Sequence, residues 1–292
     1  MICAVIVSYN SNKVFRCFES VKKQADKILI VDNGSKDADF LNYLKELETS
    51  NDNLTVIFNS ENLGIASALN AGVKYAGSLK ADWLLTLDDD SELPENTVLN
   101  IFSEFNELPK GTKDKCGLLA LKYVERNTND TGLPRRYAPR NDDFKTVKYA
   151  LTSGNFIKMS AFEKIGLFEE KLFIDQVDND FDFRLRKNGF TLLESQNSYI
   201  LHEIGISQKK LGFTIRNYSP VRRYYLSRNC VYILKKYLFF DTASVLRIFI
   251  GSICGGIFKI TLFEKQKLPK YKYILFGLID GILNKYCNKY NP

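Results

Sequence analysis

Several residue types and motifs are scarce or missing in this 292-residue chain, and each absence narrows its class. The six cysteines are scattered and form no C-x-x-C pair, which argues against a zinc site or a disulfide framework and is typical of reduced thiols in a cytoplasmic protein. No G-x-G-x-x-G follows the first apolar run, and no G-x-x-x-x-G-K-[ST] occurs anywhere, so the dinucleotide-binding and P-loop folds are disfavoured. Because an apolar run starts at residue 2, we expect no secretory signal peptide.

Acidic residues are scarce near the end of the chain. Residues 209–292 hold 16 Lys and Arg against 3 Asp and Glu, a net charge of +13, whereas residues 1–208 hold 25 against 31, a net charge of −6. A basic end on a mildly acidic body suggests an anionic surface or substrate as partner. Nucleic acid could use such a mixture of cations and aromatic residues, but nothing in residues 1–208 supports that interpretation, and we expect no nucleic-acid partner.

The first half of the chain alternates between two hydrophobic patterns. Short apolar runs end in polar loops, and three of the first four are followed by apolar residues at helical spacing. The expected strands are 2–7, 27–31, 54–58, 82–87, 117–121 and 152–157, and the expected helices are 14–21, 38–48, 65–76, one opening near Pro94, and 160–168. This repetition predicts an α/β fold with a mostly parallel, doubly wound sheet flanked by helices.

Three neighbouring carboxylates follow the fourth predicted strand. Asp88, Asp89 and Asp90 come directly after Trp83-Leu84-Leu85-Thr86-Leu87, and their charges would repel one another strongly. A divalent cation at the carboxyl end of the strand would neutralise them, and ligands in open α/β sheets lie at that end. The alternative is a solvated acidic turn.

A set of short motifs occurs in a specific order along the chain. The motifs are Val7-Ser8-Tyr9-Asn10, Val31-Asp32-Asn33-Gly34-Ser35, Asn62-Leu63-Gly64-Ile65-Ala66, Leu87-Asp88-Asp89-Asp90, Phe173-Ile174-Asp175-Gln176-Val177-Asp178, Arg184 ahead of Lys187-Asn188-Gly189-Phe190, and His202-Glu203-Ile204-Gly205. Over about residues 1–230 the sequence resembles inverting glycosyltransferases of family 2, which have the GT-A (Rossmann-like) fold. It most resembles the bacterial rhamnosyltransferase and galactofuranosyltransferase branch.

This resemblance implies a role for each matching residue. Asp32 would recognise the nucleotide base, with Ser8 and Tyr9 beside it, and Asn62, Gly64 and Asn70 would lie along the ribose and diphosphate. Asp88 and Asp90 would hold the divalent metal, with His202 completing its shell. Asp88 and Asp89 are also expected beside the nucleotide, although we expect the side chain of Asp89 to point away from the metal. An imidazole added to carboxylate oxygens favours Mn²⁺ over Mg²⁺.

Four aspartates compete for the role of catalytic base, the group that takes the proton of the acceptor hydroxyl. On a helix, Asp180 reaches Arg184 and Asp182 reaches Arg186, which predicts surface ion pairs. Asp178 has Phe181 and Asp182 at those offsets, and the like charge of Asp182 would raise its pKa. Together with the family match, this favours Asp178 as the base, with Asp175 as runner-up.

Three of these residues also have plain structural interpretations. His202, the one histidine of the chain, could be a core or surface residue. Asp32 could be a helix N-cap in front of an Asn33-Gly34-Ser35 turn. Gly64 could end a loop without contacting a ligand.

The last part of the sequence changes character. Amphipathic segments at about 218–238, 241–263 and 270–287 predict a helical extension, and we expect a catalytic domain over 1–215 and a basic helical region over 216–292. Arg247 and Lys259 interrupt the apolar run of 242–263, so a helix lying on a membrane surface is favoured over a spanning one. Glycines at 251 and 255, and at 277 and 281, predict close helix packing.

The sequence therefore predicts a metal-dependent inverting glycosyltransferase. The resemblance implies transfer of a sugar, rhamnose from dTDP-rhamnose or galactofuranose from UDP-galactofuranose, to a surface polysaccharide or its lipid carrier. We expect the enzyme at the inner face of the cell membrane, with homo-oligomerisation left open. The alternatives are a sugar-phosphate nucleotidyltransferase, whose Gly-rich basic loop after the first strand is absent here, and a non-catalytic scaffold.

Overall fold

The computed structural model describes residues 1–125, 144–202, 207–210, 213–286 and 290. Its contacts divide the chain into two compact units. The first unit comprises Met1–Phe168 and Phe181–Glu203, and the second comprises Glu169–Asp180 and Ile204–Pro292. This division differs from the predicted boundary at residue 215, because residues 169–180 pack with the C-terminal helices. The assignment of a catalytic domain over 1–215 stays a prediction.

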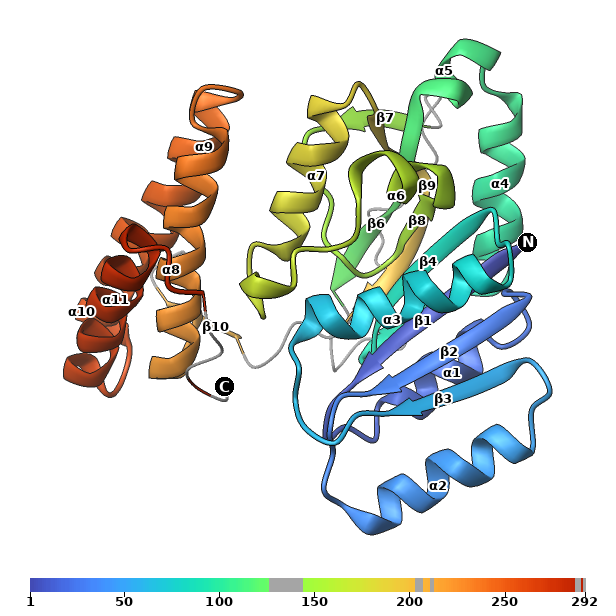
Figure 1. The fold of residues 1–292 in the computed structure, drawn as a ribbon, viewed down its shortest axis with the longest axis horizontal. Helices are drawn as coiled ribbons and strands as arrows, with labels where there is room; N and C mark the ends of the chain where they lie inside the picture. The colour runs from blue at the N-terminus through green and yellow to red at the C-terminus, as the bar shows by residue number, and fades with distance from the viewer. Residues whose placement is uncertain (126–143, 203–206, 211–212, 287–289, 291–292) are drawn as a thin grey trace. The chain divides into compact units, whose positions relative to one another are not determined.

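The first unit contains a nine-stranded mixed sheet, in the order β3-β2-β1-β4-β8-β6-β9-β5 with β7 beside β9 (Figure 1). Its strands are β1 (Ile2–Ser8), β2 (Lys27–Asp32), β3 (Leu54–Phe58), β4 (Trp83–Asp88), β5 (Ser91–Glu92), β6 (Cys116–Glu125), β7 (Phe144–Val147), β8 (Asn155–Lys158) and β9 (Thr191–His202). The pairs β1–β2, β1–β4, β2–β3 and β6–β9 are parallel, and β8 runs antiparallel between β4 and β6. The predicted mostly parallel α/β sheet is confirmed.

Helices cover both faces of this sheet. They are α1 (Val14–Val21), α2 (Ala38–Thr49), α3 (Ile65–Ser78), α4 (Thr97–Glu107), α5 (Lys110–Lys115), α6 (Met159–Ile165) and α7 (Val177–Lys187), the last of which continues from the second unit into the first. Apolar residues of α1, α2 and α4 share one core with Ala4 and Ile6 of β1. Helix α3 lies against the other face, where an added Cβ at Gly72 would meet the side chain of Val5. Both faces of β1 are therefore buried, as expected of an apolar parallel strand.

The parallel register brings three strand ends to one edge of the sheet. Ser8 at the end of β1 pairs with Asp32 at the end of β2, and Val7 pairs with Asp88 at the end of β4. Ser8, Asp32 and Asp88, which lie 24 and 56 residues apart along the chain, thus end at the same edge of the sheet, with β1 between β2 and β4. The sequence did not signal β5, a two-residue strand that pairs Ser91 with His202.

The second unit is mainly helical. It contains the 3₁₀ turn η1 (Glu170–Leu172), the hairpin of β10 (Ser207–Lys210) and β11 (Phe213–Arg216), and the helices α8 (Pro220–Tyr237), α9 (Thr242–Phe249), α10 (Gly255–Phe263) and α11 (Lys267–Ile282), with a π-helical stretch η2 (Ile250–Cys254) joining α9 to α10. Three predicted C-terminal helical segments are thus present. Ser219 caps α8 by accepting a hydrogen bond from the Arg222 N–H, and Pro220 occupies its first turn.

The two G-x-x-x-G pairs behave differently. A Cβ on Gly277 would collide with the Ser227 side chain and the Tyr224 carbonyl, and one on Gly281 would lie 2.8 Å from the Arg228 carbonyl. These two glycines allow α11 to approach α8 closely, so the predicted packing role is confirmed for them. Gly251 has no neighbour within 4 Å of an added Cβ, and Gly255 has one at 3.8 Å, so the prediction is wrong for that pair.

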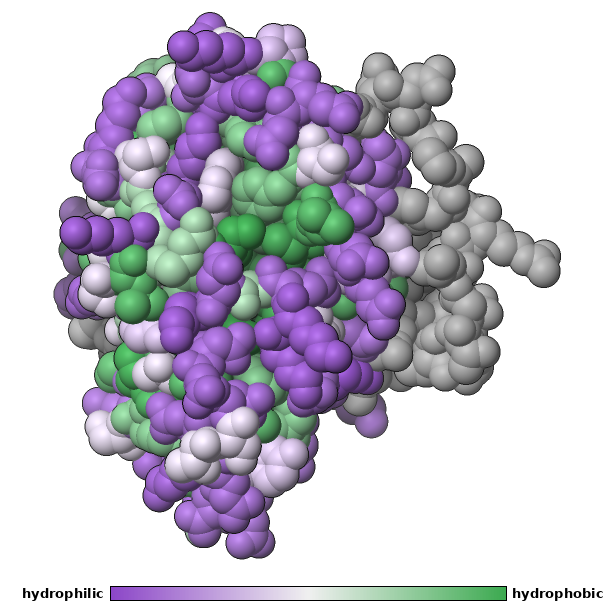
Figure 2. All heavy atoms as spheres, turned by 90° about the vertical axis from the view of Figure 1, so that its right-hand side faces the viewer, coloured by the Kyte–Doolittle hydropathy of each residue, from purple (hydrophilic) through white to green (hydrophobic). Residues whose placement is uncertain are grey.

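Large exposed apolar side chains are concentrated in the second unit. Twelve of the twenty among the described residues lie between Phe239 and Leu283. The side of the molecule that carries α4 shows hydrophilic residues around apolar patches (Figure 2). Residues 242–263 form a helical run of mean hydropathy 1.7 that is 22% buried, long and apolar enough to cross a membrane.

Candidate functional site

Two buried oxygens at the carboxyl ends of β1 and β2 lack a hydrogen-bond partner among the described residues. They are Ser8 Oγ and Asp32 Oδ1, and both residues are 0% exposed. An unsatisfied buried acceptor is costly, roughly 1–3 kcal/mol, and more for a charged group. Native proteins usually place such groups where a ligand or water completes them. The adjacent pair therefore marks this edge of the sheet as a binding surface.

The other oxygen of Asp32 has a local role. Its Oδ2 accepts a hydrogen bond from the Ser35 N–H at 3.1 Å, which closes the Asn33-Gly34-Ser35 turn. The interpretation of Asp32 as a helix N-cap is wrong, because Asp37 caps α2 by accepting from the N–H groups of Asp39 and Phe40. Asp32 is thus held by one oxygen while the other stays available to a ligand.

An asparagine network shapes the loop before α3. Asn33 Nδ2 donates to Asn62 Oδ1 at 3.0 Å, and the same Asn62 oxygen accepts from the Gly64 N–H at 2.9 Å. Gly64 has φ of +85° at the start of α3, a conformation that favours glycine. Asn62 and Gly64 therefore set the course of a loop beside Asp32. Their predicted contacts with ribose and diphosphate stay predictions.

Asn70 joins α3 to the chain after α6. It is 1% exposed, and its amide forms two hydrogen bonds with the backbone of Phe168, donating to the carbonyl at 3.0 Å and accepting from the N–H at 2.9 Å. Its predicted contact with the donor stays a prediction.

Asp89 follows β4, but its side chain bonds to the loop after β1. Its carboxylate bonds to the Ser11 side chain and the Tyr9 backbone, and burial with the charges of Asp90 and Asp88 raises its pKa to about 7. It is not among the three residues whose ligand atoms converge. The predicted division of the triplet therefore agrees with the geometry. Tyr9 itself is 41% exposed, at the mouth of this loop.

Asp88, Asp90 and His202 converge. One ligand atom of each lies within 4.8 Å of the others, and His202 Nδ1 lies 3.0 Å from Asp90 Oδ1 and 3.0 Å from Ser91 Oγ. Pairing of β5 with β9 brings His202 here from 112 residues beyond Asp90. The rest of the His202 motif, from residue 203, lies outside the described residues.

The electrostatics of this cluster favour a cation. Burial lowers the pKa of His202, but the hydrogen bond and charge of Asp90 and the charge of Asp88 outweigh it, so that pKa is raised. Burial and the charges of Asp90 and Asp88 also raise the pKa of Asp89. Two carboxylates and an imidazole are a donor set that suits Mn²⁺. The residues present therefore fit the divalent metal that the motif predicts.

Two serines and a tyrosine support the cluster and were not identified from the sequence. Ser153 Oγ accepts from the Asp88 N–H at 2.9 Å and lies 2.7 Å from Ser91 Oγ. The Tyr123 ring lies 4.9 Å from the His202 ring. No local signal marks Ser153, because the pairing of β8 with β4 brings it to Asp88 from 65 residues away.

Asp178 lies in the second unit, in the first turn of α7. It is half-buried, and its Oδ1 accepts from the Asn179 N–H at 2.8 Å. The residues before it have unusual backbone: Phe173, Asp175 and Gln176 have φ of 63°, 62° and 65°. Such conformations cost of the order of 1–3 kcal/mol each and occur where the surroundings impose them.

The other aspartates of α7 are not surface residues. Asp180 is 0% exposed and accepts from Tyr237 Oη at 2.6 Å and Lys236 Nζ at 2.9 Å. Asp182 is 2% exposed and accepts from the Ala150 N–H at 2.7 Å. The prediction of surface ion pairs is therefore wrong, because both carboxylates are buried against partners far away in the sequence.

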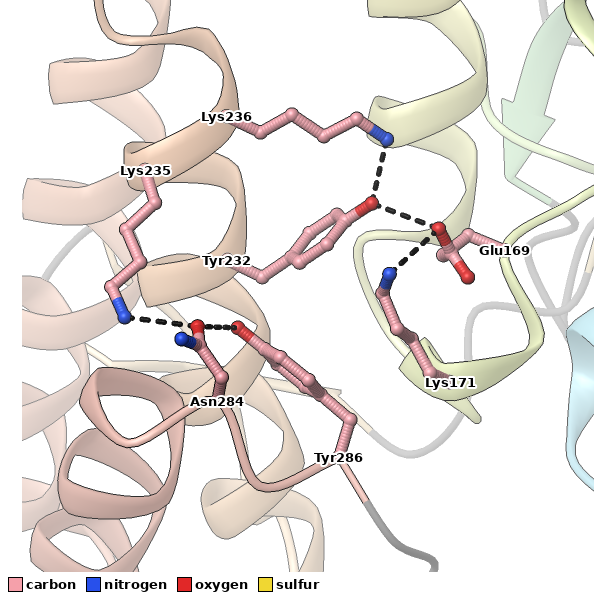
Figure 3. Close-up of a pocket in the computed structure, with 7 residues that line it drawn as sticks. All are labelled: Glu169, Lys171, Tyr232, Lys235, Lys236, Asn284 and Tyr286. Carbon is pink, nitrogen blue, oxygen red and sulfur yellow. Dashed lines mark hydrogen bonds and ion pairs between the residues drawn. The ribbon is translucent and has the colours of Figure 1, made fainter.

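A pocket of ≈ 520 Å³ in the second unit lies between the 169–171 segment, α8 and the chain after α11 (Figure 3). Its polar groups bond to one another. Tyr232 Oη and Lys171 Nζ reach Glu169 Oε2 at 3.0 and 3.1 Å, and Lys236 Nζ lies 2.6 Å from Tyr232 Oη. This network fastens the start of the 169–178 segment to α8.

Comparison with known proteins identifies the family. Residues 3–166, more than half of the chain, match the model of glycosyl transferase family 2. The chain belongs to glycosyl transferase family 2. It is a family 2 hexosyltransferase with a nucleotide-sugar donor, and this excludes the alternatives of a nucleotidyltransferase and a non-catalytic scaffold.

Two relatives are similar in sequence over most of the chain. The dTDP-rhamnosyl transferase RfbF of Shigella flexneri is 27% identical over 96% of this chain and 95% of its own length. The galactofuranosyltransferase GlfT1 of Mycolicibacterium smegmatis is 22% identical over 81% of this chain and 83% of its own length. These matches bear out the predicted rhamnosyl and galactofuranosyl branch of the family.

A solved structure supports the fold. S. aureus TarS 1–349 matches with a TM-score of 0.62 and 17% identity, over 98% of this chain and 82% of the TarS 1–349 chain. The fold of this family 2 member is therefore GT-A, as predicted.

Asp32→Asn should weaken nucleotide binding. The oxygen of the asparagine side chain can still accept from the Ser35 N–H. Its NH₂ group, however, takes the place of Oδ1, so the N–H of the base would face a donor instead of an acceptor. We expect UDP and dTDP to bind about 10- to 100-fold more weakly by isothermal titration calorimetry. Asp37→Asn is the matched control, because asparagine also caps helices and binding should not change. Equal affinity of the Asp32→Asn variant and the wild type would contradict the role of Asp32.

Proposed function

We propose that this chain is a metal-dependent inverting glycosyltransferase that transfers L-rhamnose from dTDP-rhamnose. The acceptor is a glycan or a lipid-linked saccharide in cell-surface polysaccharide synthesis. The observation that carries the donor assignment is the 27% identity to a dTDP-rhamnosyl transferase over 96% of the chain. Galactofuranose from UDP-galactofuranose is the second candidate, which the similarity to GlfT1 favours.

The nucleotide contacts of this proposal come from the ends of β1 and β2. Asp32 Oδ1, buried and without a partner among the described residues, would accept a hydrogen bond from the base, and Ser8 Oγ beside it would bind the same nucleotide. Tyr9, Asn62 and Gly64 shape the loops around them. A carboxylate acceptor suits a pyrimidine such as thymine or uracil, because N3 of each carries a hydrogen.

A divalent cation, Mn²⁺ or Mg²⁺, would be held by Asp88, Asp90 and His202. When bound, it would neutralise the diphosphate that leaves as the glycosidic bond breaks. Asp89 would hold the loop after β1 through Tyr9 and Ser11. A solved GalNAc-T7, which shares the fold, contains UDP and Mn²⁺.

Asp178 would remove the proton from the acceptor hydroxyl as that oxygen attacks the anomeric carbon. The runner-up, Asp175, is engaged by a forked pair of hydrogen bonds. Arg222 Nε donates to one Asp175 oxygen at 3.2 Å, and Arg222 Nη2 donates to the other at 3.0 Å. An acceptor hydroxyl would have to compete with Arg222 for either oxygen of Asp175. This contact favours Asp178.

The exposed apolar surface of the second unit would contact the inner face of the cell membrane. Ile250 and Leu262, in the run of 242–263, are 56% and 55% exposed. Residues 209–292 add a net charge of +13, which attracts anionic lipid. We infer a helix lying in the interface, since Arg247 and Lys259 disfavour a spanning one.

Metal binding should depend unequally on Asp89, Asp90 and His202. Mn²⁺ at a hundredfold excess over its Kd stabilises the folded state by about 2.7 kcal/mol. We expect Asp90→Asn to abolish the Mn²⁺-induced rise in melting temperature, His202→Ala to reduce it, and Asp89→Asn to change it least, because Asp89 bonds to the loop after β1. Differential scanning fluorimetry measures all three. An equal loss in Asp89→Asn and Asp90→Asn would show that this division of the triplet is wrong.

Asp178→Asn should separate binding from transfer. With Mn²⁺ and a lipid-diphosphate-linked saccharide, the wild type should form product from dTDP-rhamnose faster than from UDP-galactofuranose. The variant should bind the donor normally but lose transfer by at least about 10²-fold, because no group accepts the proton. Radiolabelled product measures transfer. Full activity of the variant would remove Asp178 as the base, and a preference for UDP-galactofuranose would favour the second candidate donor.

Apolar side chains should determine membrane binding. Each large apolar side chain that enters the interface contributes roughly 1.5–3 kcal/mol. Ile250→Asp or Leu262→Asp should therefore cut co-sedimentation with phosphatidylglycerol vesicles by about tenfold or more. Leu99→Asp is the matched control, since Leu99 is 68% exposed on α4 in the first unit. Failure of the wild type to sediment with these vesicles at low salt would contradict the membrane contact.

A further inference from the structure

The strained segment before Asp178 is held by a short run of residues in α8. Non-glycine residues rarely adopt positive φ, yet three of the four residues from Phe173 to Gln176 do so. A chain keeps such a backbone only where its surroundings over-determine it. The segment and α8 both belong to the second unit, so their contacts are internal to it.

Asn229 provides the main restraint. It is 0% exposed, and its amide nitrogen donates to three carbonyls of the segment: those of Leu172 and Ile174, both at 2.7 Å, and that of Asp175 at 3.0 Å. The amide carries two hydrogens, so the three carbonyls share them. These carbonyls can point at one nitrogen only because the backbone between them is bent into its unusual conformation.

Arg228 fixes the orientation of that amide. Arg228 Nε donates to Asn229 Oδ1 at 3.0 Å, so the opposite end of the amide, which carries the hydrogens, faces the segment. Arg228 Nη2 also donates to the carbonyls of Lys171 and Leu172, at 2.8 and 3.1 Å. Arg228 is itself 0% exposed and lies over the Tyr225 ring at 4.7 Å. The two neighbouring residues of α8 thus act as one unit.

Other residues of α8 bind the segment on either side of this pair. Arg222 holds the Asp175 carboxylate, and the Tyr225 ring stacks on Phe173 with centroids 5.0 Å apart. Near the end of α8, Tyr237 and Lys236 bind the Asp180 carboxylate. Asp178 lies between these attachment points, so its place relative to α8 is determined from both sides.

We propose that Asn229, oriented by Arg228, is a positioning residue for the transfer reaction: it holds residues 172–176 in the conformation that places the Asp178 carboxylate for proton removal. This rests on the proposed role of Asp178 as the base. The restraint acts on geometry and not on the donor, so its loss should appear in kcat. A carboxylate misplaced by about 1 Å can lower the rate 10²-fold.

Asn229→Asp tests the proposal in the full-length chain. The substitution keeps size and shape and still accepts from Arg228, but it puts an oxygen that cannot donate against three carbonyls. We expect kcat for dTDP-rhamnose transfer to fall by about 100-fold, while KM for the donor changes less than about threefold. Backbone amides of residues 173–178 should exchange their hydrogens faster.

Ser227→Ala is the matched control. It removes a buried hydroxyl from the same helix, whose Oγ donates to the α8 carbonyls of Arg223 and Tyr224 at 2.8 and 3.0 Å and to no carbonyl of the segment. We expect its kcat and the exchange of residues 173–178 to match the wild type. An equal fall in kcat for both variants would overturn the proposal, as would an Asn229→Asp variant with wild-type kcat.

A double variant separates this proposal from that of the base. If Asn229 acts through Asp178, adding Asn229→Asp to Asp178→Asn should lower transfer by less than about threefold beyond Asp178→Asn alone. Wild-type transfer by Asp178→Asn, together with a slow Asn229→Asp variant, would show that the base assignment is wrong and would overturn positioning through Asp178. A full 100-fold further loss in the double variant would also overturn it.

Discussion

Repulsion among carboxylates at the end of β4 is the constraint on which the donor site depends. Asp88, Asp89 and Asp90 end a buried strand with no cation among their nearest sequence neighbours, and burial together with the charges of Asp90 and Asp88 raises the pKa of Asp89 to about 7. The fold directs Asp89 away from the other two carboxylates. Asp89 bonds to the loop after β1, whereas Asp88 and Asp90 converge with His202 on a place suited to a divalent cation.

The sheet explains why these groups meet the nucleotide contacts. Parallel pairing of β1 with β2 and β4 brings Ser8, Asp32 and Asp88 to one edge, and the short β5 pairs with the end of β9 to add His202. In the second unit, α8 holds the strained segment that precedes the candidate base. The buried side chains of Asn229 and Arg228 stabilise its positive φ angles, which glycines would otherwise adopt more readily.

Much of this could be predicted from the sequence. The α/β pattern and the helical extension follow from hydrophobic periodicity, and the family follows from the ordered motifs. The convergence of Asp88 and Asp90 follows from their place at the end of a strand. The failures share one cause. Asp180 and Asp182 look like partners of Arg184 and Arg186, because helical spacing is local, but folding buries both against Tyr237, Lys236 and Ala150. The pairing of the Asn70 amide with the Phe168 backbone likewise joins residues 98 positions apart, which no local pattern indicates.

By itself, the sequence determined the elements, the family and the residue types at each strand end, because hydrophobic periodicity and adjacent motifs are properties of short stretches of chain. The tertiary structure decided which side chains share a site. It paired His202 with Asp90 and placed Ser153 behind Asp88. It also showed Arg222 on Asp175 and Asn229 under the strained backbone. These contacts join residues 47 to 112 positions apart, and only strand order and helix packing determine such distances.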